Sequence, residues 1–325
     1  MVRFFQAIGE ETMLIERKKG GTESLHPDAL RLDVQPVKDS LRLFITESRK
    51  AVDAFEAAMP QIEPVIEMLI EHMRVGGRLI YVGAGTSGRL AAQNAAECVP
   101  TFGIPKGKVI AIMAGGPNAL LHSVEGAEDD ADAARNEMRE LILGSKDVVC
   151  GIAASGTTPF VIAALLEARY QRSAHTVLIT CGTIPTYYGA PIAEHVILLD
   201  TGPEIIAGST RLKAGTGQKL IMDAMTSIVF ARLGKTYGGL MIDVQATNEK
   251  LRKRAARFIQ YLTKVSATLA MALLHTATWN VKKAVVMHTK EVSAVEATKI
   301  LREHDDNLRS VIGDVDYIAN SKEVE

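Results

Sequence analysis

Five short apolar runs that alternate with helical stretches constrain the fold of this 325-residue chain more than any other feature. Each run is rich in valine and isoleucine and apolar on both faces, which is typical of parallel strands covered by helices on each side. Most of the intervening stretches have the periodicity of helices. The alternation predicts a doubly wound α/β fold with a five-stranded parallel sheet, its strands at residues 78–83, 108–115, 147–155, 175–182 and 195–200.

The region before the first run predicts an arm and helices. Residues 1–35 are mixed in composition and are expected to be irregular. Helical spacing from Val37 to Met73, interrupted by Pro60, predicts two helices in this part of the chain. Further helices are expected between the strands, at about residues 87–97, 119–141 and 159–171, and after the last strand, at about 212–233.

No strand pattern returns after Asn248. Helical patterns follow at residues 250–275, 281–288, 293–303 and 305–312. We therefore predict two domains. Residues 1–245 form the α/β domain with its N-terminal helical arm, and residues 246–325 form a small all-helical domain and tail.

Composition excludes several classes of partner. The 37 Lys and Arg residues balance 38 Asp and Glu residues, and only 5% of the residues are aromatic. Nucleic-acid binders usually show a basic excess or stacking aromatic residues, so no nucleic-acid partner is expected. No apolar run approaches the roughly 18 residues that span a bilayer, and the first residues lack the apolar core of a signal peptide, so no membrane partner is expected either.

The cysteines and histidines predict neither disulfides nor a metal site. Cys98, Cys150 and Cys181 lie far apart, and two of them sit inside apolar runs, which indicates buried free thiols in a reducing compartment. The eight histidines are scattered without the spacing of metal ligands. The chain is therefore expected to be cytoplasmic and to hold no metal.

Three loops that follow strands share a chemistry that suits a phosphate. Ligands of open parallel sheets bind at the carboxyl ends of the strands. Each loop offers small residues, hydroxyls and a helix start that favours an anion. The candidate phosphate ligands are Thr86 and Ser87 in the first loop, Ser155, Gly156 and Thr157 in the second, and Ser209, Thr210 and Lys213 in the third.

Simpler roles stay open for some of these residues. Ser87, Thr158 and Ser209 could be helix N-caps, and Lys213 could be a solvated helix lysine. The first loop, GAGTSG, fits the glycine spacing of a dinucleotide site. However, the second strand ends in IMAGG, without the acidic residue that such a site uses, and no Walker lysine follows the glycines. The loops therefore suit one phosphate on a small molecule better than a dinucleotide.

Two acidic residues are candidates by position. Glu97 ends the helix that the first loop begins. Glu128 lies three residues after Glu125, so the two share a face if the segment is helical. Glu128 could instead cap the following helix, a role that also fits Asp129 and Asp130. Position alone does not select Glu97 from the 38 acidic residues.

Several motifs together resemble one enzyme family. VGAGTSGRL, AECVPTFG, IMAGGPNAL, SVEGAEDD, GIAASGTTPFV, GSTRLKAGTGQK and DVQATNEKL occur in this order over about residues 75–312. The combination is similar to the N-acetylmuramic acid 6-phosphate etherases of the sugar isomerase (SIS) domain superfamily. The resemblance implies a SIS fold for the sheet domain, a C-terminal helical domain like ubiquitin-associated modules, and a homodimer whose pairing completes the site.

The resemblance also implies a reaction. The family cleaves the D-lactyl ether of N-acetylmuramic acid 6-phosphate to N-acetylglucosamine 6-phosphate and D-lactate, without metal or organic cofactor, when cell-wall sugar is recycled in the bacterial cytoplasm. By motif match, Glu97 in AECVPT would be the general acid at the ether oxygen, and Glu128 in EGAEDD would be the base at the sugar C2. One carboxylate must then work protonated and the other ionised.

Two departures from the family pattern bear on substrate preference. Val99-Pro100 stands where the family has two prolines. The N-terminal region lacks the Ser-Thr-Leu-Glu segment that is usual in the family. This N-terminal region is expected to contact the active site of a partner subunit. Two other functions stay open. One is a different SIS sugar-phosphate isomerase, which would not need Glu97 as an acid. The other is a non-catalytic sugar-phosphate sensor like the glucokinase regulatory protein, which holds two such domains in a longer chain.

Overall fold

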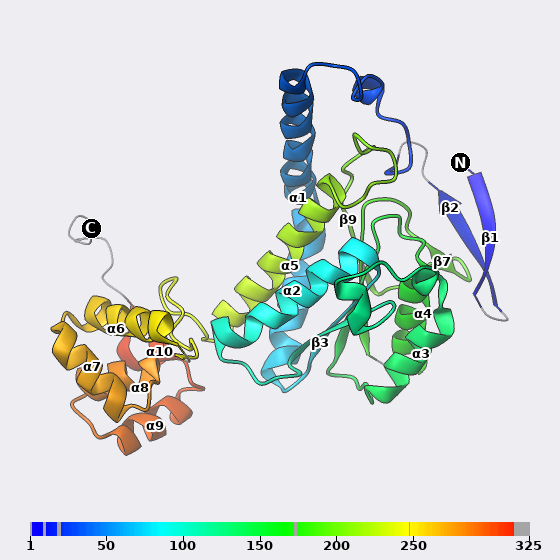
Figure 1. The fold of residues 1–325 in the computed structure, drawn as a ribbon. Coiled ribbons are helices and arrows are strands. Elements are labelled where there is room, and N and C mark those ends of the chain that lie inside the picture. The colour runs from blue at the N-terminus through cyan, green and yellow to red at the C-terminus, as the bar shows by residue number, and fades with distance from the viewer. Residues whose placement is uncertain (1, 9–10, 18–20, 172–173, 247, 315–325) are drawn as a thin grey trace. The chain divides into compact units, whose positions relative to one another are not determined.

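The computed structural model describes residues 2–8, 11–17, 21–171, 174–246 and 248–314 (Figure 1). A five-stranded sheet of order β4-β3-β5-β6-β9 contains only parallel neighbours. The five predicted strands are confirmed, and each is shorter than its apolar run because the strand ends turn into loops. They are β3 (Leu79–Gly83), β4 (Val109–Met113), β5 (Val148–Ile152), β6 (His175–Thr180) and β9 (His195–Leu198).

Helices cover both faces of the sheet, as the doubly wound prediction requires. Figure 1 shows α3 (Ala131–Glu140) and α4 (Pro159–Leu166) on one face. On the other face it shows α1 (Val37–Arg74), α2 (Gly85–Phe102) and α5 (Lys213–Arg232).

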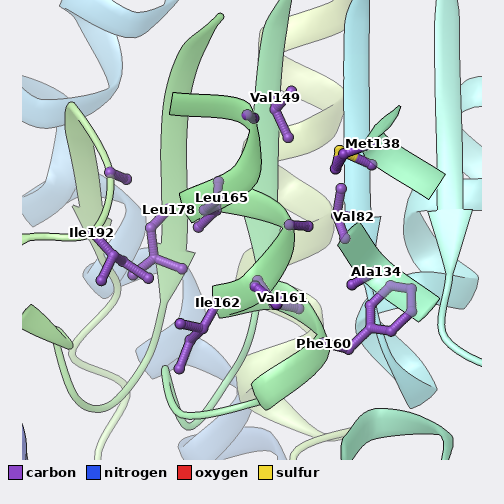
Figure 2. Close-up of a cluster of buried hydrophobic side chains, with 14 of the residues drawn as sticks. Val82, Ala134, Met138, Val149, Phe160, Val161, Ile162, Leu165, Leu178 and Ile192 are labelled. Atoms are coloured by element: carbon purple, nitrogen blue, oxygen red, sulfur yellow. The ribbon is translucent and has the colours of Figure 1, made fainter. Parts of the chain in front are cut away.

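A large cluster of buried apolar side chains fills the space between the sheet and the first pair of helices (Figure 2). Val82 and Val149 of the sheet and Val161 of α4 belong to this cluster, and all three side chains are completely buried. Gly151 of β5 leaves no room for a side chain, because an added Cβ would lie 2.7 Å from Val161 Cγ1 and from Leu165 Cδ1. The backbone of β5 therefore lies directly against α4, which fixes the loop between them.

The prediction of two helices before the sheet is wrong, because α1 runs unbroken through Pro60 and Pro64. A proline inside a helix removes one backbone donor and usually bends or ends it. Both prolines are exposed here, so water can bind the carbonyl groups that lose their partners. The buried face continues past them from Ala58 through Ile62 to Leu69. Burial of that face holds the helix together.

The expected irregular arm at residues 1–35 contains a hairpin. Strands β1 (Val2–Ile8) and β2 (Glu11–Arg17) pair antiparallel, with Val2 opposite Arg17. A short 3₁₀ turn, Pro27–Ala29, precedes α1. A second small hairpin, β7 (Thr186–Tyr187) with β8 (Ala190–Pro191), lies between β6 and β9.

Contacts divide the chain into two compact units. The first comprises residues 1–96 and 107–226, and the second comprises 97–106 and 227–325. The predicted boundary at residue 245 follows the sequence pattern, and it stays a prediction. Where the structure describes the chain, no helix is long and apolar enough to cross a membrane.

The second unit has its own apolar core, built largely from short helices. The predicted helix at residues 250–275 is two helices, because Lys264 has a left-handed backbone and Ser266 caps a new start by accepting a hydrogen bond from Leu269 N. The helices are α6 (Glu249–Thr263), α7 (Ala267–Thr276), α8 (Val281–Thr289), α9 (Ala294–Glu303) and α10 (Leu308–Ile312).

Candidate active site

A hydroxyl-lined pocket of about 330 Å³ lies at the carboxyl edge of the sheet. Its walls come from the loops after β5 and β6 and from the segment before α1. The strand order puts β3 between β4 and β5, so the direction of winding reverses between β3 and β5, and the loop after β5 at this switch point forms one wall of the pocket. The lining residues are Gly21, Thr22, Glu23, Ser24, Ser155, Thr157, Gly182 and Thr183.

The loop after β5 has the shape that the sequence predicted for a ligand cradle. Gly156 has φ +77°, and a Cβ there would lie 1.9 Å from the carbonyl oxygen of Thr183, so no larger residue fits. Ser155 Oγ accepts hydrogen bonds from Thr157 N at 3.2 Å and from Thr157 Oγ1 at 3.0 Å. The two hydroxyls are thereby held together at the pocket wall.

The start of α4 is suited to an anion. Thr158 is the N-cap residue of α4, as the alternative role held, but its side chain makes no capping hydrogen bond within the described residues. Pro159 takes the first helical position, where its missing N–H costs nothing. A phosphate bound at Ser155 and Thr157 would lie at the positive end of this helix.

The start of α5 differs, because protein groups already occupy it. Glu204 accepts hydrogen bonds from Lys213 N at 3.3 Å and Ala214 N at 2.9 Å, so a carboxylate satisfies the helix start. Lys213 is 3% exposed and donates from Nζ to Glu47 Oε2 at 2.6 Å. The solvated-lysine alternative for Lys213 is therefore wrong. The role of Lys213 as a phosphate ligand stays a prediction. Its ammonium group already has an anionic partner, the carboxylate of Glu47.

The loop after β3 is packed tightly for structural reasons. An added Cβ on Gly88 would lie 2.8 Å from the carbonyl oxygen of Gly83, so these glycines let the strand and α2 approach each other. Ser87 is buried inside α2 and donates to Gln218 Oε1 of α5 at 2.9 Å. Thr86 lies beside the start of α5. If Gly215 carried a Cβ atom, that atom would lie 3.4 Å from Cγ2 of Thr86.

The segment before α1 joins the pocket to the loop before α5. Gly208 N donates to Thr22 O at 3.1 Å, which places the predicted ligands Ser209 and Thr210 next to this segment. We expected the N-terminal region to contact the site of a partner subunit. In the structure, Thr22 and Ser24 line the pocket of their own chain.

A buried ion network fixes this segment to α1. His26 Nδ1 accepts from Asp28 N, so its Nε2 carries the proton and donates to Glu47 Oε2 at 3.1 Å. Burial raises the pKa of Glu47, but hydrogen bonds from Lys213, Lys50 and His26 and the charge of Lys213 outweigh it and hold the pKa at about 2. Glu47 is therefore ionised at neutral pH.

The two acids predicted from the motifs lie in different units. Glu128 is exposed in a 3₁₀ turn, Ala127–Asp129, and forms no hydrogen bond or ion pair within the described residues. Asp130 caps α3 by accepting from Ala133 N at 2.8 Å, so the capping role belongs to Asp130 and not to Glu128. Glu97 is exposed on α2 and belongs to the second unit.

Sequence reasoning missed part of the pocket. Thr183 follows β6 with the same glycine-and-hydroxyl pattern as the other loops, so that pattern could have found it. Thr22, Glu23 and Ser24 carry no such signal, because they precede the sheet by more than fifty residues. The three cysteines are free and buried, as predicted, and burial raises the pKa of Cys181 to about 12. Within the described residues, no group of three His, Cys, Asp or Glu side chains could hold a metal ion.

A family profile and solved structures resemble the part of the chain that holds the sheet. A profile of the glucokinase regulatory protein N-terminal SIS domain matches residues 61–169. Among solved structures, a phosphoheptose isomerase from Francisella tularensis is similar with 17% identity and a TM-score of 0.45, covering 61% of this chain and 100% of that one.

Curated relatives are similar over nearly the whole sequence. The N-acetylmuramic acid 6-phosphate etherase of Staphylococcus saprophyticus is 40% identical over 90% of this chain and 98% of its own length. The enzyme of the same name from Deinococcus radiodurans is 41% identical over 92% of this chain and 97% of its own length. Since this identity extends over nearly the full length of both sequences, the chain belongs to the N-acetylmuramic acid 6-phosphate etherase family.

Proposed function

We propose that this chain is an enzyme that cleaves the D-lactyl ether of N-acetylmuramic acid 6-phosphate, releasing D-lactate and N-acetylglucosamine 6-phosphate. The observation that carries the proposal is the 40% identity of this chain to an N-acetylmuramic acid 6-phosphate etherase over 98% of that relative's length. The pocket supports it, because hydroxyls beside an uncapped helix start suit a phosphate. No cofactor is needed for the chemistry.

The reaction that we propose is an elimination followed by addition of water, which makes the enzyme a carbon–oxygen lyase. In the open-chain sugar, the ether at C3 lies β to the C1 aldehyde. Removal of the C2 proton gives an enolate, which expels lactate when an acid protonates the ether oxygen. Water then adds to C3 of the unsaturated aldehyde, and the proton returns to C2.

In this scheme Glu128 removes the C2 proton and Glu97 protonates the leaving oxygen. Glu128 is suited to the role of base, because it is exposed and engaged by no other described side chain. The phosphate is held mainly by Ser155 and Thr157, which line the pocket before the start of α4, and by Gly156 between them. Thr86, Ser209 and Thr210 stand in the neighbouring loops. Ser87 and Lys213 would first have to leave Gln218 and Glu47.

We propose that the enzyme works as a homodimer paired through α1. One face of α1 over residues 37–59 is apolar and exposed, with a seven-residue repeat from Ile45 through Val52 to Met59 that suits helix-to-helix packing. A second copy of the chain would cover this face. Its members, between 45% and 75% exposed, are Val37, Leu41, Phe44, Ile45, Val52 and Met59.

The position of Glu97 along α2 supports pairing as well. The helix starts at Gly85, at the carboxyl edge of the sheet, and runs away from it. At about 1.5 Å per residue, Glu97 lies roughly 18 Å along the helix axis from Gly85. A hexose phosphate is shorter than this distance. We therefore propose that Glu97 acts on substrate bound to the other subunit.

We place the reaction in the cytoplasm, in the recycling of cell-wall sugar. Burial of the free cysteines supports a reducing compartment, because Cys98, Cys150 and Cys181 are not paired in disulfides. The muramic acid substrate is a component of bacterial cell walls. Its phosphorylated form must come from an enzyme that adds the phosphate.

A sugar-phosphate sensor is the second candidate. The match of residues 61–169 to the glucokinase regulatory protein domain favours it, because that profile describes a regulator. A sensor would bind the same ligand in the same pocket without turning it over. Presence of both motif acids, Glu97 and Glu128, favours the enzyme.

The test is incubation of the purified chain with N-acetylmuramic acid 6-phosphate, followed by an assay for D-lactate. The enzyme should release D-lactate from this sugar and far less from unphosphorylated N-acetylmuramic acid, since the phosphate supplies binding energy away from the reacting carbons. Saturable binding without lactate would identify a sensor. Equal turnover of both sugars would contradict the phosphate site.

A further inference from the structure

One carboxylate in the pocket has no role in the proposed reaction. Glu23 lines the cavity with Ser155, Thr157 and Thr183, and its side chain is exposed. Within the described residues, it forms no hydrogen bond and no ion pair. If Gly208 carried a Cβ atom, that atom would lie 3.1 Å from Oε2 of Glu23, so the Glu23 side chain extends along the loop before α5. A carboxylate that has no partner among the described residues, beside the proposed phosphate site, requires an explanation.

The backbone that carries Glu23 is fixed on both sides. Thr22, the residue before it, is 2% exposed and accepts a hydrogen bond from Gly208 N. His26, three residues after it, is 4% exposed and bonded to the ionised Glu47. Residues 22–26 are therefore anchored at both ends while the Glu23 side chain stays available to a ligand. Such an arrangement is typical of a binding residue.

The charge of Glu23 determines which part of the ligand it can meet. Among the described residues that line the pocket there is no lysine or arginine, so none of them offsets repulsion between a phosphate and this carboxylate. The phosphate must lie at the α4 end of the cavity, beside Ser155 and Thr157. Glu23 then faces the other end of the ligand, where a sugar carries hydroxyl groups. A carboxylate is a strong acceptor for such donors.

We propose that Glu23 is a specificity-determining residue that accepts hydrogen bonds from the hydroxyls of the bound sugar. This inference rests on the proposed sugar-phosphate substrate and adds a contact to it. Glu23 strengthens binding of a sugar phosphate and weakens binding of phosphate alone. The pocket thereby distinguishes its ligand from the inorganic phosphate of the cell.

The experiment measures two dissociation constants by calorimetry, for N-acetylglucosamine 6-phosphate and for inorganic phosphate. Glu23→Gln removes the charge with little change in shape. Its sugar-phosphate binding should weaken roughly tenfold, because a charge-assisted hydrogen bond is lost. Its phosphate binding should tighten about threefold, because repulsion is removed. Glu140→Gln, an exposed glutamate at the end of α3, is the matched control and should change neither constant.

Opposite changes in the two constants are the signature of a sugar contact. Weakening of both ligands would indicate that Glu23 only supports the loop, and it would overturn the proposal. Unchanged constants, or failure of the unmodified protein to bind the sugar phosphate, would overturn it too. Failure of the proposed function is recognised separately, as intact sugar-phosphate binding with no D-lactate released.

Discussion

At the scale of single residues, the hydroxyls of the strand-end loops have two different roles. Ser155 lines the pocket, and within the described residues its hydroxyl bonds only to Thr157 of its own loop, so it remains able to bind a ligand. Ser87 belongs to the same sequence pattern but is buried and bonded to Gln218. Identical residue types in similar loops therefore predict different responses to substitution.

Alanine substitutions should separate these roles. Ser155→Ala should raise the KM for the sugar phosphate by about 10- to 100-fold, since a hydrogen bond to a charged group is worth about 1.5–3 kcal/mol. It should leave the melting temperature nearly unchanged. Ser87→Ala should instead lower the free energy of unfolding by about 1 kcal/mol. A large KM change for Ser87→Ala with unchanged stability would show that Ser87 binds the phosphate after all.

Hydrogen exchange at C2 should separate the two acids. Glu128→Gln should abolish both lactate release and exchange of the C2 hydrogen with solvent deuterium, because no base remains. Glu97→Gln should block lactate release but leave the exchange measurable by NMR, because enolate formation needs only the base. Each loss should be about 10²–10⁴-fold. Exchange that survives in Glu128→Gln and stops in Glu97→Gln would reverse the assignment.

The sequence could not predict the partners of Ser87 and Lys213. Ser87 bonds to a residue 131 positions away, and Lys213 bonds to one 166 positions away. Local pattern places a hydroxyl or an ammonium at a helix start, but the competing partner comes from a helix elsewhere in the chain. Gly156 could be predicted, because a tight loop needs a backbone that only glycine adopts easily.

At the scale of elements, α1 differs most from the sequence prediction, because it is one continuous helix where two were expected. Its prolines suggested a break, but their exposed positions leave the buried face intact. Its first half buries only Glu47 before Ala51. The remaining apolar side chains are left for a partner, which is why we assign the dimer contact to this helix.

Charge on this face should break the dimer. Leu41→Glu with Phe44→Glu should convert the protein to monomers in sedimentation experiments, because two copies would bring like charges into an apolar contact. Arg42→Glu, a substitution between these positions, is the control and should keep the dimer. Activity should fall with dissociation if Glu97 acts on the other subunit. Monomers of full activity would contradict the shared site.

Mixed dimers provide an independent check of that sharing. Glu97→Gln and Glu128→Gln chains, unfolded and refolded together, should regain about a quarter of the unmodified rate, since half of the dimers carry one intact site. No recovery would place both acids in one subunit.

The ion pair between α1 and α5 makes stability depend on pH. The pKa of Glu47 is lowered from 4.5 to about 2, so its stabilisation is complete above pH 4.5 and is lost as the pH falls toward 2. The difference in unfolding free energy between the unmodified protein and Glu47→Gln should shrink by about 3 kcal/mol over that range. Denaturant titrations measure it, with Asp53→Asn, an exposed α1 residue, as control. A difference that does not vary with pH would contradict this.

At the scale of the whole molecule, the sheet was predictable and the division into units was not. Buried parallel strands carry a strong local signal, so all five were found in the sequence. Residues 97–106 join the second unit through contacts far along the chain, a feature that no local pattern encodes. The pocket also combines segments that are far apart in the sequence. The loops after β5 and β6 follow predicted strands, whereas residues 21–24 belong to no predicted strand or helix.

The most direct test of the proposed elimination is the fate of oxygen from labelled water. The reaction should be run on N-acetylmuramic acid 6-phosphate in ¹⁸O-water, and both products should be analysed by mass spectrometry after borohydride reduction of the sugar. N-acetylglucosamine 6-phosphate incubated in the same water corrects for exchange at C1. The label should appear at C3 of the sugar and not in lactate, because the ether oxygen departs with lactate. Label in lactate, with none at C3, would contradict elimination and the roles of Glu97 and Glu128.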